Sequence, residues 1–135
     1  MMPAIALSAK DFERIENLLD SLPKDFSVVR DRLFAELERA DVLEIEDVPA
    51  TLVTMNSRVR FTVLSTGASM VRRLVYPRDQ AADAENISVL TPMGSALLGL
   101  SVGQEIEWNL EANKTMRVRI DAIEYQPESA GDHHL

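Results

Sequence analysis

The hydrophobic pattern of this chain changes its period once, near residue 48. Before that point apolar residues recur at steps of three and four, which is the spacing of one face of an α-helix. Beyond it they alternate with polar residues, which is the spacing of a half-buried β-strand. The sequence therefore predicts an α+β fold, with a helical segment over residues 1–48 and an antiparallel β-sheet domain over residues 49–135.

The helical segment contains two amphipathic stretches that are separated by Pro23. Ser8 is placed to cap the first helix by accepting a hydrogen bond from the Asp11 amide. The two apolar faces follow at Phe12, Ile15, Leu19 and Leu22, and at Val29, Leu33, Leu37 and Ala40. We expect an exposed ion pair between Arg32 and Glu36. The helices should form a short antiparallel hairpin with arms of about 20–25 Å, which leans on the sheet domain for stability.

The second half predicts four or five strands and one short helix. The strands are expected at residues 58–63, 70–76, 87–90, 106–110 and 116–125. Thr66-Gly67 supplies a hairpin turn, and the shift of the apolar phase at Ile123 indicates a β-bulge. Pro92 suits the first turn of the short helix and Gly99 suits its end.

Acidic residues outnumber basic ones by 22 to 14, which gives a formal net charge of −8. The chain lacks the excess of Lys and Arg that would neutralise nucleic-acid phosphates, so a protein partner is favoured over direct binding to nucleic acid. Outward-facing arginines of the sheet could form a small basic patch, but we favour cross-strand pairs with glutamates. The arginines are Arg58, Arg60, Arg117 and Arg119, and the glutamates are Glu105, Glu107 and Glu111.

The sequence contains no residue pattern for common catalytic chemistry. Its only histidines, His133 and His134, are adjacent, where two side chains rarely ligate one metal ion, and there is no cysteine. Phosphate-binding glycine motifs do not occur. We therefore expect no enzyme activity, no cofactor and no metal. Residues 1–7 lack the basic start of a signal peptide and are too short for a membrane span, which predicts a cytoplasmic protein without membrane contact.

The tip of the predicted hairpin carries two carboxylates, Asp20 and Asp25, around Pro23 and Lys24. Paired carboxylates on a projecting tip could hold Mg²⁺, because this ion takes one or two carboxylates and fills its shell with water and phosphate oxygens. Asp25 also stands where an acidic side chain caps a helix start. We favour the capping interpretation and assign no metal site.

Residues 91–103, T-P-M-G-S-A-L-L-G-L-S-V-G, resemble the carboxy-terminal domain of the Gre transcript elongation factor family. The Rnk regulators of nucleoside diphosphate kinase share this domain and are the closer match. The Rnk-like segments are V-T-M-N-S-R-V-R-F from Val53, L-V-Y-P from Leu74, A-L-L-G-L from Ala96 and E-Y-Q-P-E-S-A-G-D from Glu124. The resemblance covers nearly the whole chain. One departure is Gly103-Gln104, where the Gre pattern has Gly-Asp.

The resemblance implies a helical hairpin on an FKBP-like sheet domain that docks on bacterial RNA polymerase, at the coiled-coil rim of the secondary channel. The docking edge would be the turn Thr91, Pro92, Met93 and Gly94, with Leu97 behind it; alternatively, these residues only turn the chain. Gre factors have longer arms and two acidic tip residues that hold Mg²⁺, whereas the arms expected here are shorter. The resemblance therefore implies a regulator that competes with Gre factors without promoting transcript cleavage.

Three other functions stay open. An active Gre-like cleavage factor would need Asp20 and Asp25 to converge at the polymerase active centre. A prolyl isomerase, which the FKBP-like sheet suggests, would need an aromatic pocket, whereas the aromatic side chains here are expected mostly to fill the core. Direct regulation of nucleoside diphosphate kinase is implied by the resemblance alone.

Overall fold

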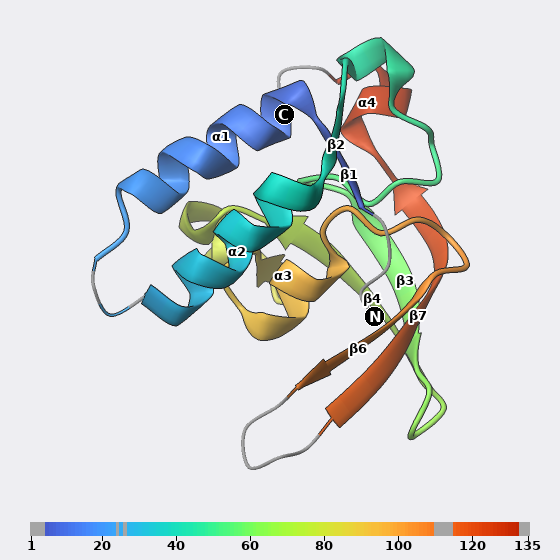
Figure 1. The fold of residues 1–135 in the computed structure, drawn as a ribbon. Coiled ribbons are helices and arrows are strands. Elements are labelled where there is room, and N and C mark those ends of the chain that lie inside the picture. The colour runs from blue at the N-terminus through green and yellow to red at the C-terminus, as the bar shows by residue number, and fades with distance from the viewer. Residues whose placement is uncertain (1–4, 24, 26, 110–114, 133–135) are drawn as a thin grey trace.

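The computed structural model describes residues 5–23, 25, 27–109 and 115–132 of the chain. Figure 1 shows a curved sheet with two longer helices lying beside it. The elements follow in the order β1 (Ala6–Ser8), α1 (Ala9–Asp20), α2 (Ser27–Arg39), β2 (Asp41–Leu43), η2 (Ile45–Asp47), β3 (Arg58–Val63), β4 (Ala68–Val75), η3 (Pro77–Ala82), β5 (Asn86–Ser88), α3 (Pro92–Leu97), β6 (Glu105–Asn109), β7 (Thr115–Tyr125) and α4 (Pro127–Ala130). The α+β fold that the sequence predicts is confirmed.

The main sheet has five strands in the order β5-β4-β3-β7-β6. The pairs β4-β3, β3-β7 and β7-β6 are antiparallel, as expected. Gly67, with a φ of 75°, forms the predicted turn between β3 and β4, and its amide donates to the Val63 carbonyl at 2.8 Å. β5 differs from the expectation because it runs parallel to β4, after η3 has carried the chain back along that strand.

The pairing of β7 with β3 shifts register at two places, and the predicted bulge is the one between Arg60 and Phe61 of β3. Phe61 pairs with Ile120, but Arg60 already pairs with Ala122, so Asp121 stands opposite no residue of β3. The extra residue moves the apolar side chains of β7 from one phase of the alternation to the other. The phase shift in the sequence therefore has the physical cause that we expected.

Several small elements are not predicted by the sequence pattern, among them β1, β2 and α4. β1 and β2 form a parallel two-stranded sheet that joins the chain before α1 to the chain after α2. α4 follows β7, with Gln126 as its N-cap and Pro127 in its first turn. Elements of three or four residues are too short to show a hydrophobic period, so they do not emerge from such a pattern.

α1 and α2 form the predicted antiparallel hairpin (Figure 1). Ile15, Leu19 and Leu33 are fully buried on its inner faces. They belong to the same hydrophobic core as Phe61 of β3 and Leu97 of α3. The hairpin thus leans on the sheet for its stability, and the division of the chain at residue 48 stays a prediction.

A polar contact crosses between the two helices of the hairpin, and an ion pair lies within α2. Arg30 Nε of α2 donates to the Leu19 carbonyl near the end of α1 at 3.3 Å. Among the described residues, Glu36 pairs with Arg39 at 2.8 Å and not with Arg32, so the expected ion pair is wrong. Glu36 is only 8% exposed, whereas Arg32 lies on the exposed side of α2, and the two side chains therefore face different surroundings.

Candidate partner-binding site

Hydrogen bonds of Thr91 fix the turn from β5 into α3. The Thr91 hydroxyl donates to the Ser88 carbonyl at 2.7 Å and accepts the Gly94 amide at 3.0 Å, which makes Thr91 the N-cap of the helix. Pro92 is the first helical residue, where a missing backbone N–H removes no bond within the helix. This is the helix start that the sequence predicts, and it gives the turn one defined orientation.

Gly94 allows α3 to pass very close to the backbone of β5. A Cβ at this position would lie 2.1 Å from the carbonyl oxygen of Ser88, far inside van der Waals contact. The helix can therefore pack here only if residue 94 has no side chain. Gly94 is buried, and its lack of a side chain allows α3 to pack closely on β5.

The structure brings the predicted docking residues together in one turn and one short helix. Thr91 and Met93 are half-buried, and Met93 packs one side of its chain against the hydrophobic core. Leu97 is fully buried. Among the described side chains of this set, Thr91 and Met93 are thus the two that reach the surface, while Gly94 and Leu97 support them from inside.

The hairpin tip is open to solvent at the residues that the structure describes. Asp20 ends α1, and Asp20, Pro23 and Asp25 are all exposed, while Lys24 lies outside the described residues. α2 begins at Ser27, two residues after Asp25, and the capping role of Asp25 stays a prediction. Within the described part of the chain, no group of three or more acidic or histidine side chains is placed to hold a metal ion.

The four outward-facing arginines are all paired with carboxylates. Arg58 meets Glu85 at 2.8 Å and thereby holds the pKa of that carboxyl below its usual range. The other three pairs are Arg60 with Glu124, Arg117 with Glu107, and Arg119 with Asp121. The expected pairing with the suggested glutamates is confirmed only for Arg117, and the other three arginines pair with different carboxylates.

Gln104, which stands where the Gre pattern has aspartate, closes a turn. Its side-chain Oε1 accepts the Ser101 amide at 2.8 Å. The backbone here pairs with β7, since the Gly103 amide donates to the Ile120 carbonyl at 2.8 Å and the Gln104 carbonyl accepts the Ile120 amide at 3.0 Å. A glutamine oxygen thus supplies a hydrogen bond here that a carboxylate oxygen could also accept.

A buried polar cluster joins the start of α1 to the sheet domain and to α4. Asp11 Oδ2 accepts the Met55 amide at 3.0 Å, and the Thr54 hydroxyl donates to Glu128 Oε1 at 2.7 Å. Lys10 Nζ lies 3.3 Å from Glu128 Oε2. Sequence reasoning assigned Asp11 only to the start of a helix, because the partners are 44 and 74 residues apart and no local signal connects them.

Burial raises the pKa of Asp11 from 3.8 to about 6, and the nearby Glu128 carboxylate adds to the rise. The Met55 amide, Lys10 and the Ser8 hydroxyl act in the opposite direction. Between these two pH values the folded state therefore binds more protons at Asp11 than the unfolded state does. The contribution of Asp11 to the free energy of unfolding falls as pH rises through this window and is constant above it.

Asp11→Asn should remove this pH dependence, because asparagine does not ionise and its oxygen can still accept the Met55 amide. Between pH 4 and pH 7.5, the wild type should lose about 2 kcal/mol of unfolding free energy relative to the variant. Urea unfolding at both pH values measures the difference. Asp20→Asn, at an exposed position, controls for the loss of one charge. Parallel pH profiles for the wild type and Asp11→Asn would contradict the prediction.

Two family models match the chain. The model described as "Rnk N-terminus" matches residues 3–43. The model described as "Transcription elongation factor, GreA/GreB, C-term" matches residues 48–125. None of the helices among the described residues has both the length and the hydrophobicity that a membrane span requires.

Individual relatives agree with these matches. The chain is 43% identical over 133 residues to the "Regulator of nucleoside diphosphate kinase" of Escherichia coli K12, and the match covers 98% of both chains. It is 29% identical over 94 residues to "Transcription elongation factor GreA" of Thermodesulfovibrio yellowstonii, covering 70% of this chain and 59% of that one. A solved structure, "Prokaryotic transcription elongation factor GreA/GreB from Nitrosomonas europaea", aligns with a TM-score of 0.73 and 48% identity over 91% of this chain and 99% of that chain.

Proposed function

Because the chain belongs to the family that joins an Rnk N-terminal segment to a GreA/GreB C-terminal domain, we propose that it is a transcription regulator that docks on bacterial RNA polymerase. The proposed docking site is the turn at Thr91, Pro92 and Met93, facing the coiled-coil rim of the secondary channel. The protein competes there with Gre factors and does not stimulate transcript cleavage.

The hairpin supports the proposal that the protein does not stimulate cleavage. α1 has 12 residues and α2 has 13, so the arms are about 18 and 20 Å long. Leu19, next to the last residue of α1, is still fully buried in the core. α1 is thus packed against the body of the protein almost to its end. This short reach is the observation that carries the proposal.

The rigidity of the turn supports the proposed docking site. Thr91 holds α3 by two side-chain hydrogen bonds, and Gly94 fixes its distance from β5. A surface that is already ordered loses little conformational entropy when a partner binds. Met93 offers an apolar side chain at the surface, which is the kind of residue that is enriched in protein interfaces.

Met93→Glu should weaken polymerase binding about tenfold or more, because a carboxylate without a partner would be buried against the rim helices. Competition with a labelled Gre factor for core polymerase measures the affinity. Circular dichroism checks the fold, since Met93 also packs against the core.

Met70→Glu is the matched control for this variant. Met70 is likewise half-buried against the core, but it lies in β4 before the stretch that pairs with β5. Met70→Glu should destabilise the protein about as much as Met93→Glu does, and it should leave the affinity for polymerase unchanged. Equal competition by folded Met93→Glu and wild type would place the docking surface elsewhere.

Direct regulation of nucleoside diphosphate kinase is a second candidate function. It is supported by the name of the Escherichia coli relative, which matches this chain over 98% of its length. If it applies here, adding the purified protein should change the phosphotransfer rate of purified nucleoside diphosphate kinase in the absence of polymerase. An unchanged rate at a molar excess of the protein would exclude direct regulation.

A further inference from the structure

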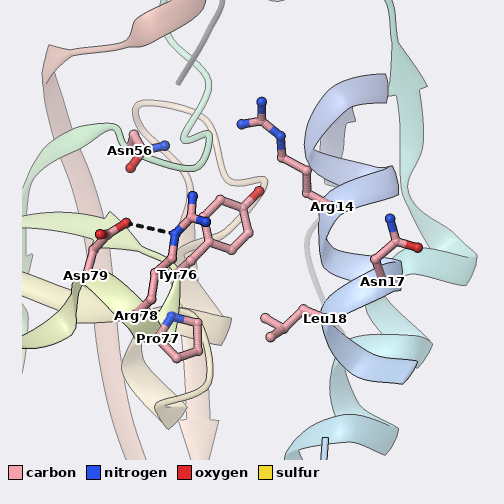
Figure 2. Close-up of a pocket in the computed structure, with 8 residues that line it drawn as sticks. All are labelled: Arg14, Asn17, Leu18, Asn56, Tyr76, Pro77, Arg78 and Asp79. Carbon is pink, nitrogen blue, oxygen red and sulfur yellow. Dashed lines mark ion pairs between the residues drawn. The ribbon is translucent and has the colours of Figure 1, made fainter. Parts of the chain in front are cut away.

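A cleft with a volume of about 660 Å³ lies where α1 faces η3 and the loop before β3. Figure 2 shows its two walls, with Arg14 and Leu18 projecting from α1 toward Tyr76, Arg78 and Asn56 on the other side. The residues that line it are Arg14, Asn17, Leu18, Asn56, Tyr76, Pro77, Arg78 and Asp79. The cleft is of the size that holds a small molecule in known proteins.

The charge of the cleft is opposite to that of the whole chain. Two arginines and one carboxylate line it, in a protein with a formal net charge of −8. Asp79 pairs with Arg78 at 3.7 Å (Figure 2). No ion pair is found for Arg14 among the described residues, and its guanidinium extends into the space between the walls (Figure 2). The cleft therefore presents a positive charge to an incoming ligand.

Tyr76 supplies a buried polar atom on the same cleft. The residue is 8% exposed, and its hydroxyl has no hydrogen-bond partner among the described residues. Burial and the nearby Asp11 raise the pKa of Tyr76, while the neighbouring Arg14 guanidinium partly offsets the rise. The hydroxyl therefore stays protonated at neutral pH and can donate. A buried donor of this kind is costly to leave unsatisfied.

Asn56, at the far wall, has a left-handed backbone conformation, which asparagine adopts more readily than most other residues with a side chain. Its φ is 66°, and it is the one residue other than glycine with a positive φ among the described positions. The backbone is held there because the Asn56 amide donates to the Leu74 carbonyl at 2.6 Å. Residues held in sparsely populated conformations cluster at binding sites. The side-chain amide of Asn56 thus adds a hydrogen-bonding group to the lining.

We propose that this cleft binds a small organic anion, namely a phosphate or carboxylate group attached to a planar apolar body. Arg14 and the Tyr76 hydroxyl would both donate to the anionic oxygens, with Asn56 beside them. Leu18 and Pro77 form the apolar part of the lining, against which the body of the ligand would pack. Guanidinium groups suit both oxyanions, because their paired N–H groups match the oxygen spacing.

The proposed ligand would bridge two parts of the fold. Arg14 and Leu18 come from α1, whereas Tyr76, Pro77 and Arg78 come from the segment after β4. A ligand that contacts both walls binds the folded state alone and so raises the melting temperature with increasing concentration. This inference is independent of polymerase docking, because none of the proposed docking residues lines the cleft.

The test uses the full chain with phenyl phosphate, benzoate and benzyl alcohol as probes. Phenyl phosphate or benzoate is expected to bind with a Kd of about 1 mM or tighter. NMR titration of the backbone amide signals measures this affinity. Shifts should centre on Asn17, Asn56 and Arg78. Benzyl alcohol, which lacks the anion, should bind at least tenfold more weakly. Comparison of the first two probes distinguishes phosphate from carboxylate.

Two variants test the assigned contacts. Arg14→Ala should weaken binding of the anionic probe about tenfold, and Tyr76→Phe about fivefold. Tyr76→Phe should leave the melting temperature without ligand unchanged or higher, because it removes a buried hydroxyl that has no protein partner. Arg117→Ala removes the same charge at an exposed site on β7 and should bind normally.

Three outcomes would overturn the proposal. The first is that neither anion binds, and the second is that both bind the Arg14→Ala variant as well as the wild type. The third is that Arg14→Ala weakens polymerase binding while the probes neither bind nor compete, which would make the cleft a protein-contact surface.

Discussion

Leu33→Asp is expected to destabilise the whole protein, not only the helical hairpin. Leu33 is fully buried in the core that α1 and α2 share with the sheet. Aspartate at this position would leave a cavity and an unpaired charge, at a cost of about 4 kcal/mol or more. In a domain of this size, the melting temperature should fall by roughly 12 °C or more.

Ala35→Asp is the matched control for this variant. It introduces the same charge two residues along α2, at an exposed position. Its effect should stay below about 1 kcal/mol, which reflects helix propensity. Thermal unfolding followed by circular dichroism compares the two variants. Equal melting temperatures for Leu33→Asp and Ala35→Asp would show that the hairpin does not pack as described.

Gly94→Ala should destabilise the protein by about 3 kcal/mol, although alanine normally favours a helix. The added Cβ would lie 2.1 Å from the Ser88 carbonyl oxygen, and backbone atoms can separate only if α3 moves away from β5. Because α3 carries the proposed docking turn, the same change should weaken polymerase binding. Chemical unfolding and polymerase competition measure the two effects.

Gly67→Ala separates this steric effect from backbone strain. Gly67 has a φ of 75°, but nothing lies within 4 Å of a Cβ added there. The substitution should therefore cost only the strain of a left-handed alanine, about 1 kcal/mol. If Gly94→Ala proves no more destabilising than Gly67→Ala, the close contact between α3 and β5 is not as described.

The sequence predicted the features that depend on neighbouring residues. Ser8 caps α1 by accepting the Asp11 amide at 3.1 Å, and Thr91 with Pro92 begins α3. Gly67 turns β3 into β4. In each case the hydrogen bond closes within four residues, so its donor and acceptor can be recognised in a short stretch of sequence.

Features that depend on distant residues were missed. The parallel pairing of β5 with β4 depends on the path of η3, and the β1-β2 sheet joins the two ends of the hairpin. Asp11 was expected only at a helix start, but its carboxylate reaches Met55 in the sheet domain. A hydrophobic period cannot reveal such pairs, because it reports which face is buried and not what it is buried against.

The candidate site was predictable in place but not in detail. The residues from Thr91 to Leu97 do form one turn and helix, yet the sequence could not show that Gly94 is needed for packing against β5. It also gave no sign of the cleft, whose walls come from α1 and η3 and meet only through the tertiary fold. Docking of Thr91 and Met93 on polymerase stays a prediction.

Transcript cleavage in a backtracked elongation complex tests the central claim most directly. With Mg²⁺ and a Gre factor present, increasing amounts of this protein should slow the stimulated cleavage by competing for polymerase. Added alone, the protein should leave the intrinsic cleavage rate unchanged, because its arms of about 18 to 20 Å end close to the body of the fold. Faster cleavage with the protein alone, if Asp25→Asn abolishes it, would contradict the account. Gre-stimulated cleavage that stays unchanged at a large excess of the protein would contradict it as well.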